Sequence, residues 1–297
     1  MPRVRKAVIP AAGRGTRFLP ATKAQPKEML PIVDTPTIQF VVEEAVASGI
    51  TDILIITGKD KRSIEDHFDR SMELEMFLDQ SNKRGMSHDI RKLSKLAHIH
   101  YIRQPEQLGL GDAIMHARYH VADEPFAVLL GDTIVDSKIP CTRQLMNVFE
   151  RYNGSVIGLE RVEKAKVSRY GIVDGRQVEA RTYALAGLVE KPAPADAPSR
   201  LAIGGRYVLT PDIFECLDKT APARNGEIQL TDALRRQCRD KAVYGYRFDG
   251  VRYDIGNKVD YLVTQIEYAL RRPDLRGGLM PHLRRIAGLA GGRNKRR

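Results

Sequence analysis

Short apolar runs alternate with helical patterns along the first half of the chain. Lys6–Pro10 (KAVIP) and Asp52–Thr57 (DILIIT) have the composition of strands, and residues 36–48 between them repeat apolar side chains at helical spacing before Gly49. Residues 126–130 (FAVLL) form an uninterrupted apolar run, which is typical of a strand buried on both faces. Strands that alternate with helices predict parallel strands joined by crossover helices, so we expect an α/β fold.

The second half of the chain mixes strands and helices less regularly. We expect strands at residues 155–161, 171–173, 184–190, 202–208 and 242–247, and helices near 212–217, 228–239 and 259–270. This pattern favours a central mixed, mostly parallel sheet that continues from the first half and is flanked by helices. A charged, mostly helical insertion over about residues 69–97 belongs to no strand–helix repeat.

The positive charge of the chain is concentrated at its C-terminal end. The 297 residues carry a formal net charge of +11. Nine basic residues and one acidic residue lie between Arg271 and Arg297, so this segment carries +8 and residues 1–270 carry only +3 (11 − 8). A nearly balanced body predicts no specific nucleic-acid partner. Residues 273–297 are predicted to be a basic, flexible tail, which would bind polyanions only weakly and in a salt-sensitive way.

Several classes of protein are disfavoured by the composition. No stretch approaches the roughly 20 apolar residues of a membrane helix, and the apolar run near the N-terminus is too short for a signal peptide, so we expect a soluble, cytoplasmic protein without a membrane partner. The three cysteines are far apart and show no CxxC spacing, which predicts neither disulfides nor a zinc site. His116 and His120 lie one helical turn apart, but no third ligand or HExxH context accompanies them, so we expect no metal there.

A glycine-bearing loop follows the first strand, where ligands bind in open α/β sheets. Residues 11–17 (AAGRGTR) let a backbone approach phosphate closely, and their N–H groups can form an anion-binding nest. The P-loop pattern is absent, and Phe18 stands where a dinucleotide fingerprint would need its last glycine. Residues 14–31 contain three prolines and four cations. Such a stiff, positive loop suits a triphosphate that releases pyrophosphate, although an ordinary charged surface loop is the alternative.

Longer motifs follow in a fixed order: PKEMLP (26–31), RQPEQLGLGDAI (103–114), LLGDTIVD (129–136), LVEKP (188–192), GEIQLTDAL (226–234) and YDIGNK (253–258). In these segments the chain resembles the sugar-nucleotide pyrophosphorylases, and within them the family of bacterial UTP–glucose-1-phosphate uridylyltransferases. The resemblance extends from about Lys6 to Arg271. It implies a Rossmann-like nucleotidyltransferase fold, Mg²⁺ as cofactor, and UTP and glucose 1-phosphate as substrates.

The resemblance also implies roles for residues on the nucleotide side. Nucleotide contacts are implied for Ala11, Ala12, Gly13, Glu28, Gln104 and Gly109. Arg17 and Lys27 would bind the triphosphate, and Lys27 would stabilise the transition state at the α-phosphorus. The amide of Gln104 offers both the donor and the acceptor that a uracil edge requires.

Two aspartates match the metal-binding carboxylates of the family. Asp132 follows the FAVLL strand, and Asp254 lies in the YDIG motif. Magnesium prefers oxygen ligands and often takes only one or two carboxylates plus substrate phosphates, so these two residues are chemically sufficient. For either aspartate alone, a turn or a helix cap is the alternative. Thr133 stands where many relatives carry a further aspartate.

On the sugar side, the resemblance implies that Lys191 grips the sugar phosphate and that Glu190 accepts hydrogen bonds from glucose hydroxyls. Gly171, Gly204 and Gly205 would leave room for the hexose. A Glu–Lys dipeptide on its own carries no functional signal, so these roles rest on the LVEKP match.

The implied reaction is an in-line attack by glucose 1-phosphate on the α-phosphorus of UTP, which gives UDP-glucose and diphosphate. The attacking phosphate is already anionic, so Arg17, Lys27 and Lys191 would act by positioning and charge neutralisation. Three alternatives stay open: a thymidylyltransferase that uses dTTP with the same sugar phosphate, a catalytically silent relative that regulates an active partner, and a polyanion-binding protein that uses the tail.

The expected organisation is a single nucleotidyltransferase domain over residues 1–272, followed by the tail. The nucleotide-binding half covers about residues 1–135, and the sugar-phosphate-binding half covers about residues 136–272. The insertion and the family resemblance suggest a homodimer or homotetramer.

Overall fold

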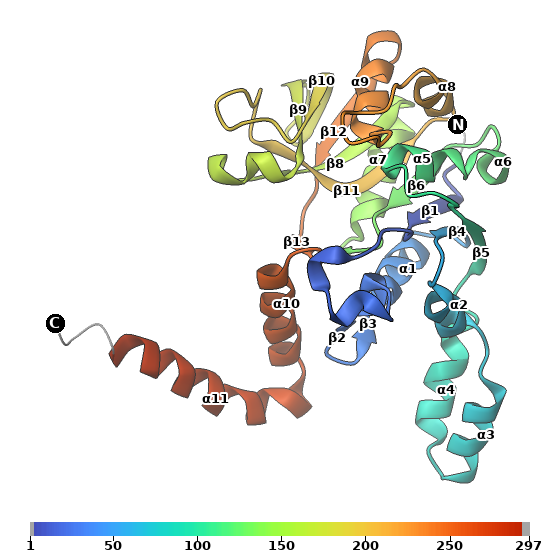
Figure 1. The fold of residues 1–297 in the computed structure, drawn as a ribbon, viewed down its shortest axis with the longest axis vertical. Coiled ribbons are helices and arrows are strands. Elements are labelled where there is room, and N and C mark those ends of the chain that lie inside the picture. Colours follow the sequence, from blue (N-terminus) through green and yellow to red (C-terminus); the bar gives the residue numbers. More distant parts are fainter. Residues whose placement is uncertain (1–2, 293–297) are drawn as a thin grey trace.

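The computed structural model describes residues 3–292 and is built on one nine-stranded sheet (Figure 1). In spatial order the strands are β5 (His98–Arg103), β4 (Asp52–Thr57), β1 (Lys6–Pro10), β6 (Phe126–Leu129), β11 (Leu201–Leu209), β8 (Ser155–Arg161), β12 (Val243–Arg247), β10 (Thr182–Glu190) and β9 (Gly171–Gln177). Only β11 and β10 run opposite to the others in this sheet. The mixed, mostly parallel sheet expected from the sequence is therefore confirmed.

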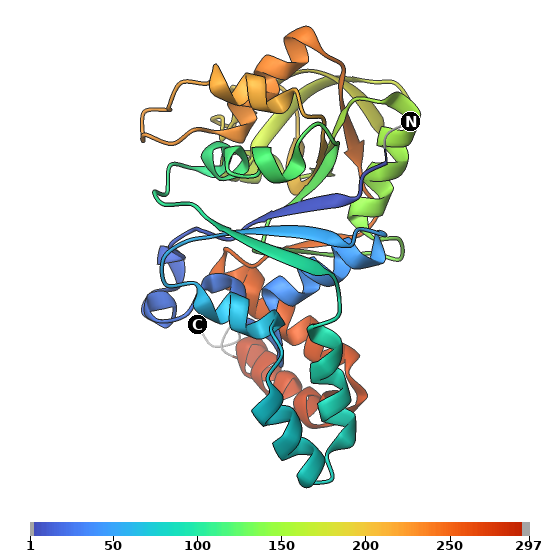
Figure 2. The same ribbon diagram turned by 90° about the vertical axis from the view of Figure 1, so that its right-hand side faces the viewer.

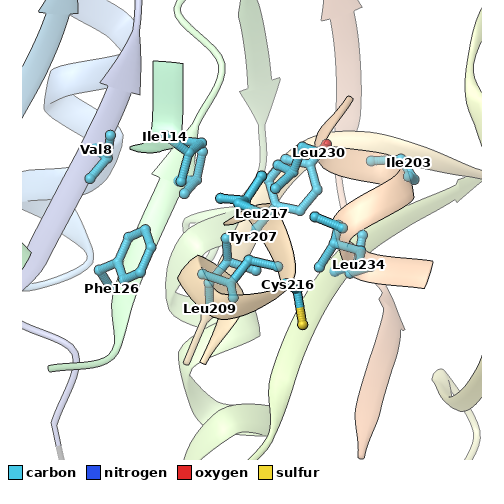
Figure 3. Packing of buried hydrophobic residues seen from close by; sticks show 14 of the residues in the cluster. Val8, Ile114, Phe126, Ile203, Tyr207, Leu209, Cys216, Leu217, Leu230 and Leu234 are labelled. Carbon is cyan, nitrogen blue, oxygen red and sulfur yellow. The ribbon is translucent and has the colours of Figure 1, made fainter. Parts of the chain in front are cut away.

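Helices cover both faces of the sheet. One face carries α1 (Thr37–Ala47), α2 (Arg62–Phe68) and α7 (Cys141–Tyr152), and the other carries α5 (Leu110–Met115), α8 (Ile213–Asp218) and α9 (Leu230–Asp240). In β1, Ala7 and Ile9 face the first helical layer, whereas Val8 packs with Phe126 and Ile114 in the second (Figure 3). The apolar runs of the first half are thus buried on both faces, as strands between two helical layers must be.

Two details differ from the sequence-based expectation. The helical pattern of residues 110–120 predicts a single helix, and the structure has two short helices there, α5 and α6 (Arg118–Val121). In addition, β7 (Thr133–Asp136) pairs antiparallel with β13 (Val251–Asp254) in a separate two-stranded sheet that the sequence did not predict. A further small pair joins β2 (Pro31–Ile32) and β3 (Thr35–Pro36).

Two helical segments project from this body (Figures 1 and 2). The expected insertion is a helical pair, α3 (Met72–Gln80) and α4 (Arg84–Leu93). At the other end of the chain, α10 (Lys258–Arg271) leads into α11 (Pro273–Gly292). A flexible tail was expected over 273–297; the structure places Pro273–Gly292 in a helix, and 293–297 lie outside the described residues. Within residues 3–292, no helix combines the length and the apolar character needed to span a membrane.

Candidate active site

The centre of the site is an ion pair between Lys27 and Asp132. Lys27 begins a short 3₁₀ helix, η3 (Lys27–Met29), and Asp132 lies in the turn between β6 and β7. The Lys27 Nζ donates to Asp132 Oδ2 at 2.5 Å. Burial by itself lowers the pKa of Lys27, but the charges of Asp132 and Glu28 outweigh it and raise that pKa above its ordinary value. For Asp132, burial acts to raise the pKa, and the opposing charge of Lys27 lowers it overall.

Glu28 lies beside this ion pair and contacts Lys27. Its carboxylate is buried, accepts a hydrogen bond from Lys61 Nζ at 2.8 Å, and lies 3.9 Å from Lys27 Nζ. Burial raises the pKa of Glu28, and the two lysines only partly offset that effect. A carboxylate held in this way is suited to positioning Lys27, and the nucleotide contact expected for Glu28 stays a prediction.

The β7–β13 pairing brings the two aspartates together. Asp254 lies opposite Thr133 in the register, and the Ile255 N–H donates to the Asp132 carbonyl at 3.0 Å. A Cβ atom placed on Gly256 would lie 3.1 Å from Asp254 Oδ1 and 3.3 Å from Asp132 Oδ2. Both carboxylates therefore face one small space beside the Gly256 backbone. Their hard oxygen donors fit a divalent cation such as Mg²⁺.

Arg17 approaches the same space from the loop after β1. Its Nη1 donates to the Gly256 carbonyl at 3.3 Å and would lie 3.4 Å from a Cβ at that glycine. Lys27 also reaches this loop, because its Nζ is 3.8 Å from the position of a Cβ on Gly13. The structure thus gathers two cations and two carboxylates, all predicted from the sequence, around one point.

The loop after β1, which was expected to contact the nucleotide, is held by a side chain that the sequence analysis missed, Gln107. The Ala11 N–H donates to the Ile56 carbonyl of β4, so the chain stays hydrogen-bonded to the sheet just after β1 ends. The Gln107 Nε2 donates to the Ala12 carbonyl at 2.9 Å, and its Oε1 accepts from Arg14 Nε at 2.6 Å. Gln107 lies within the RQPEQLGLGDAI motif, but nothing in its residue type separates it from neighbouring polar residues.

Gln104 and Gly109 have packing roles in this structure. The Gln104 Nε2 donates to Asp112 Oδ2 at 2.7 Å and to the Gly109 carbonyl at 3.2 Å, so both of its N–H donors are engaged within the protein. Gly109 has φ +99°, and a Cβ there would lie 2.8 Å from the Ile228 carbonyl. The glycine therefore lets the 104–109 loop pass close to the GEIQLTDAL segment.

Glu190 and Lys191, which were expected to bind the sugar phosphate, lie beside a third residue, Thr231. The Lys191 Nζ lies 3.0 Å from Glu190 Oε1, and the Thr231 hydroxyl donates to Glu190 Oε2 at 2.7 Å. Tyr170 connects this group to the aspartates: its carbonyl accepts from the Lys191 N–H at 3.1 Å, and its hydroxyl lies 3.4 Å from Asp254 Oδ2.

The three predicted sugar-side glycines have different surroundings. A Cβ on Gly171 would lie 3.2 Å from Glu190 Oε2, so this glycine does adjoin the Glu190 group. A Cβ on Gly204 would meet the Phe248 ring at 2.5 Å, and Gly205 has φ +77° and faces Leu130. The latter two glycines are thus required by packing and by backbone conformation.

Arg206 is the most informative residue that sequence reasoning missed. It is fully buried, and its guanidinium is bound at two points by the Glu44 carboxylate of α1. It also donates to the carbonyls of Gly205, Leu130 and Thr133. Arg206 therefore fixes the turn that carries Asp132. An arginine inside the otherwise uncharged strand LAIGGRYVL was the available signal, since a buried charge requires partners.

This fold and this arrangement of cations and carboxylates define a phosphate-binding transferase site. The profile of the nucleotidyl transferase family matches residues 6–269, and the chain belongs to that family.

Close relatives carry a more specific name. The chain is 52% identical to a UTP–glucose-1-phosphate uridylyltransferase of Staphylococcus haemolyticus, over 96% of this chain and 99% of the relative. It is 53% identical to a protein of the same name from Bacillus subtilis, over 95% and 97% of the two chains.

Solved structures agree with this grouping. A UDP-glucose pyrophosphorylase complexed with UDP-glucose superposes with a TM-score of 0.84 at 43% identity, over 91% of this chain and 100% of the other. The UTP-bound enzyme of Acinetobacter baumannii gives 0.87 at 38% identity, over 94% and 98% of the chains.

Proposed function

We propose that this chain is a UTP–glucose-1-phosphate uridylyltransferase, which converts UTP and α-D-glucose 1-phosphate to UDP-glucose and diphosphate. The observation that carries the proposal is the convergence of Arg17, Lys27, Asp132 and Asp254 on the space beside Gly256. The names of the relatives supply the choice of nucleotide and sugar.

The reaction needs no nucleophile from the protein. An oxygen of the sugar phosphate forms a bond to the α-phosphorus of UTP as the bond from that phosphorus to the bridging oxygen of the leaving diphosphate breaks. The electron pair leaves with the diphosphate, so no proton has to move. Lys27 and Arg17 offset the charge that develops on the phosphates, and Lys191 orients the attacking sugar phosphate.

The metal proposed for the site is Mg²⁺, held by Asp132 and Asp254. When bound, it would supply positive charge to the triphosphate oxygens. Residues of the chain prepare this site. The charge of Lys27 offsets that of Asp132, and Gly256, which has no side chain, leaves the space between the two carboxylates open.

The binding roles of the flanking residues complete the proposal. We assign the nucleotide to the loop of Ala11, Ala12 and Gly13, and its base to the segment between Gln104 and Gly109. We assign the sugar to the Glu190 group. The division of the domain into a nucleotide half (1–135) and a sugar-phosphate half (136–272) follows from these assignments, and a homodimer or homotetramer is the proposed assembly.

The test measures diphosphate release from purified protein with glucose 1-phosphate and Mg²⁺, with UTP, dTTP, ATP, CTP and GTP in separate reactions and a chelator control. We expect a clear preference for UTP that is lost on chelation. A preference for dTTP would make the chain a thymidylyltransferase, and silence with every nucleotide would favour a regulatory relative.

A further inference from the structure

A second group of potential metal ligands lies toward the amino ends of the parallel strands, away from the active site. Asp52 is the first residue of β4, where it pairs with Lys6 at the start of β1 and with His98 at the start of β5. His100 extends from β5, and His120 extends from α6. In the active site, in contrast, Asp132 follows the carboxyl end of β6, and Asp254 lies opposite Thr133 in the β7–β13 pair.

The ligand atoms of these three side chains are close together. The carboxylate of Asp52 and one ring nitrogen from each histidine all lie within 4.8 Å of one another. Asp52 Oδ1 is 2.9 Å from His120 Nε2 and 3.7 Å from His100 Nε2. The two imidazole rings are 4.9 Å apart between centroids. One carboxylate oxygen therefore lies within 3.7 Å of ring nitrogens of two imidazoles that come from different elements.

These separations suit a small borderline-soft cation. With zinc–ligand bonds of about 2.0–2.1 Å, neighbouring ligand atoms of a tetrahedral site lie roughly 3.4 Å apart. The two observed distances, 2.9 and 3.7 Å, bracket that value. Two imidazoles with one carboxylate are a ligand set for zinc and similar transition metals, whereas magnesium and calcium prefer oxygen ligands.

The surroundings also permit a cation. The Lys6 ammonium, which donates to the His120 carbonyl at 3.0 Å, is paired with Glu124 at 2.7 Å, so its charge is already balanced. His100 is 54% exposed, while Asp52 and His120 are partly buried. The group is thus supported on one side and open to solvent on the other, where water could complete the coordination.

We propose that Asp52, His100 and His120 form a binding site for a divalent transition-metal ion, separate from the carboxylates of the active site. A cation there would connect β4 and α6 to β5, the edge strand of the nine-stranded sheet. Its effect would be on the stability of that edge and not on phosphoryl transfer. A hydrogen-bonded Asp52–His120 pair without metal affinity is the alternative.

The test is a zinc titration of untagged, metal-free full-length protein against a chromophoric chelator, with excess Mg²⁺ present to occupy Asp132 and Asp254. We expect one zinc ion per chain. The His100→Ala and His120→Ala variants should each lose at least about tenfold in affinity, because removing even an outer-shell partner of a metal ligand costs about 10–100-fold. His88→Ala, which removes an exposed histidine on α4, is the matched control and should keep the wild-type affinity.

Two further readouts separate a built site from adventitious binding. Cobalt should give the visible absorption of a low-symmetry, tetrahedral-like site in the wild type and lose it in His100→Ala. Zinc should raise Tm of the wild type but not of that variant, because a ligand that binds only the folded state stabilises it. His100 is largely exposed, so its replacement should leave the fold intact. Equal zinc affinity in the wild type and both cluster variants, or no binding by the wild type, would overturn the proposal.

Discussion

At the scale of single residues, the proposed activity depends on charges that hold one another in place. Lys27→Ala removes the cation nearest to Asp132 and should lower kcat by about 10²–10³-fold, the usual cost of one stabilising group in a transition state. Circular dichroism should show an unchanged fold. Lys23→Ala, on the exposed part of the same loop, is the control and should retain nearly full turnover.

The pH dependence of this pair follows from the directions of its pKa shifts. The pKa of Lys27 is raised and that of Asp132 is lowered, so both groups stay charged on both sides of neutrality. Neither group should therefore produce a limb of the pH–rate profile near pH 7.

If Lys27→Ala kept near-normal turnover, Lys27 would not be a catalytic residue.

Gly256 provides a sharper test of the metal site. A Cβ at this position would lie 3.1–3.4 Å from atoms of Asp254, Asp132 and Arg17, so Gly256→Ala places a methyl group in the space that both carboxylates face. We expect the Mg²⁺ concentration for half-maximal rate to rise about tenfold, the lower end of the loss typical for disturbed metal sites. Gly187→Ala, where a Cβ meets nothing within 4 Å, should leave the Mg²⁺ dependence unchanged.

At the scale of elements, Arg206 joins parts of the fold that carry the site. Its ion pair with Glu44 connects β11 to α1, and its other donors anchor the turn before β7. Arg206→Met leaves the Glu44 carboxylate buried without its partner and should lower the free energy of unfolding by about 3–5 kcal/mol in urea denaturation. Arg151→Met breaks an exposed pair with Glu179 and should cost about 0–1 kcal/mol. Equal costs for the two variants would contradict the anchoring role.

Elements with strong local patterns were predictable from the sequence, and those made by distant contacts were not. The strands β1, β4 and β6 follow from apolar runs, and helix α1 follows from its spacing and its terminal glycine. The β7–β13 pair joins segments more than a hundred residues apart, and neither segment has a sequence pattern that identifies the other as its pairing partner. Motif resemblance predicted Asp132 and Asp254, but only tertiary structure shows that this pairing brings them together.

The same limit applies to the glycines of the motifs. Gly109 was expected to contact the nucleotide and Gly204 to leave room for the hexose. These roles stay predictions, because a sequence shows that a glycine is present but not what lies next to it. The structure places backbone of the GEIQLTDAL segment against Gly109 and the Phe248 ring against Gly204. Glycine in a motif therefore indicates a close approach, and the approaching group has to come from the fold.

At the scale of the whole molecule, α10 presents an apolar stripe to solvent. Val259, Leu262, Val263 and Ile266 follow helical spacing on one side of this helix, and the first two are 67% and 60% exposed. The helix stands apart from the sheet (Figure 1). In the homodimer or homotetramer proposed above, this stripe is a surface that a second copy of the chain would cover.

The stripe also adjoins the site, which gives its burial a consequence for activity. Val263 lines a polar cavity of about 350 Å³ together with Arg169, Tyr170 and Asp254. A second copy seated on α10 would cover Val263, which lines this cavity, and would limit how far Tyr170 and Asp254 can move. Loss of the assembly should therefore raise KM for the sugar phosphate more than it lowers kcat.

The proposed assembly through α10 is tested by placing charge in the apolar stripe. Light scattering on the wild type should give a multiple of the 33.3 kDa chain mass, and the double variant Leu262→Glu/Ile266→Glu should give the mass of one chain. Tyr119→Glu changes an isolated exposed side chain and should leave the assembly intact. A wild type that is monomeric at all concentrations would remove the assembly, and an assembly that survives the double variant would place the interface elsewhere, with the paired α3–α4 insertion the next exposed apolar surface to test.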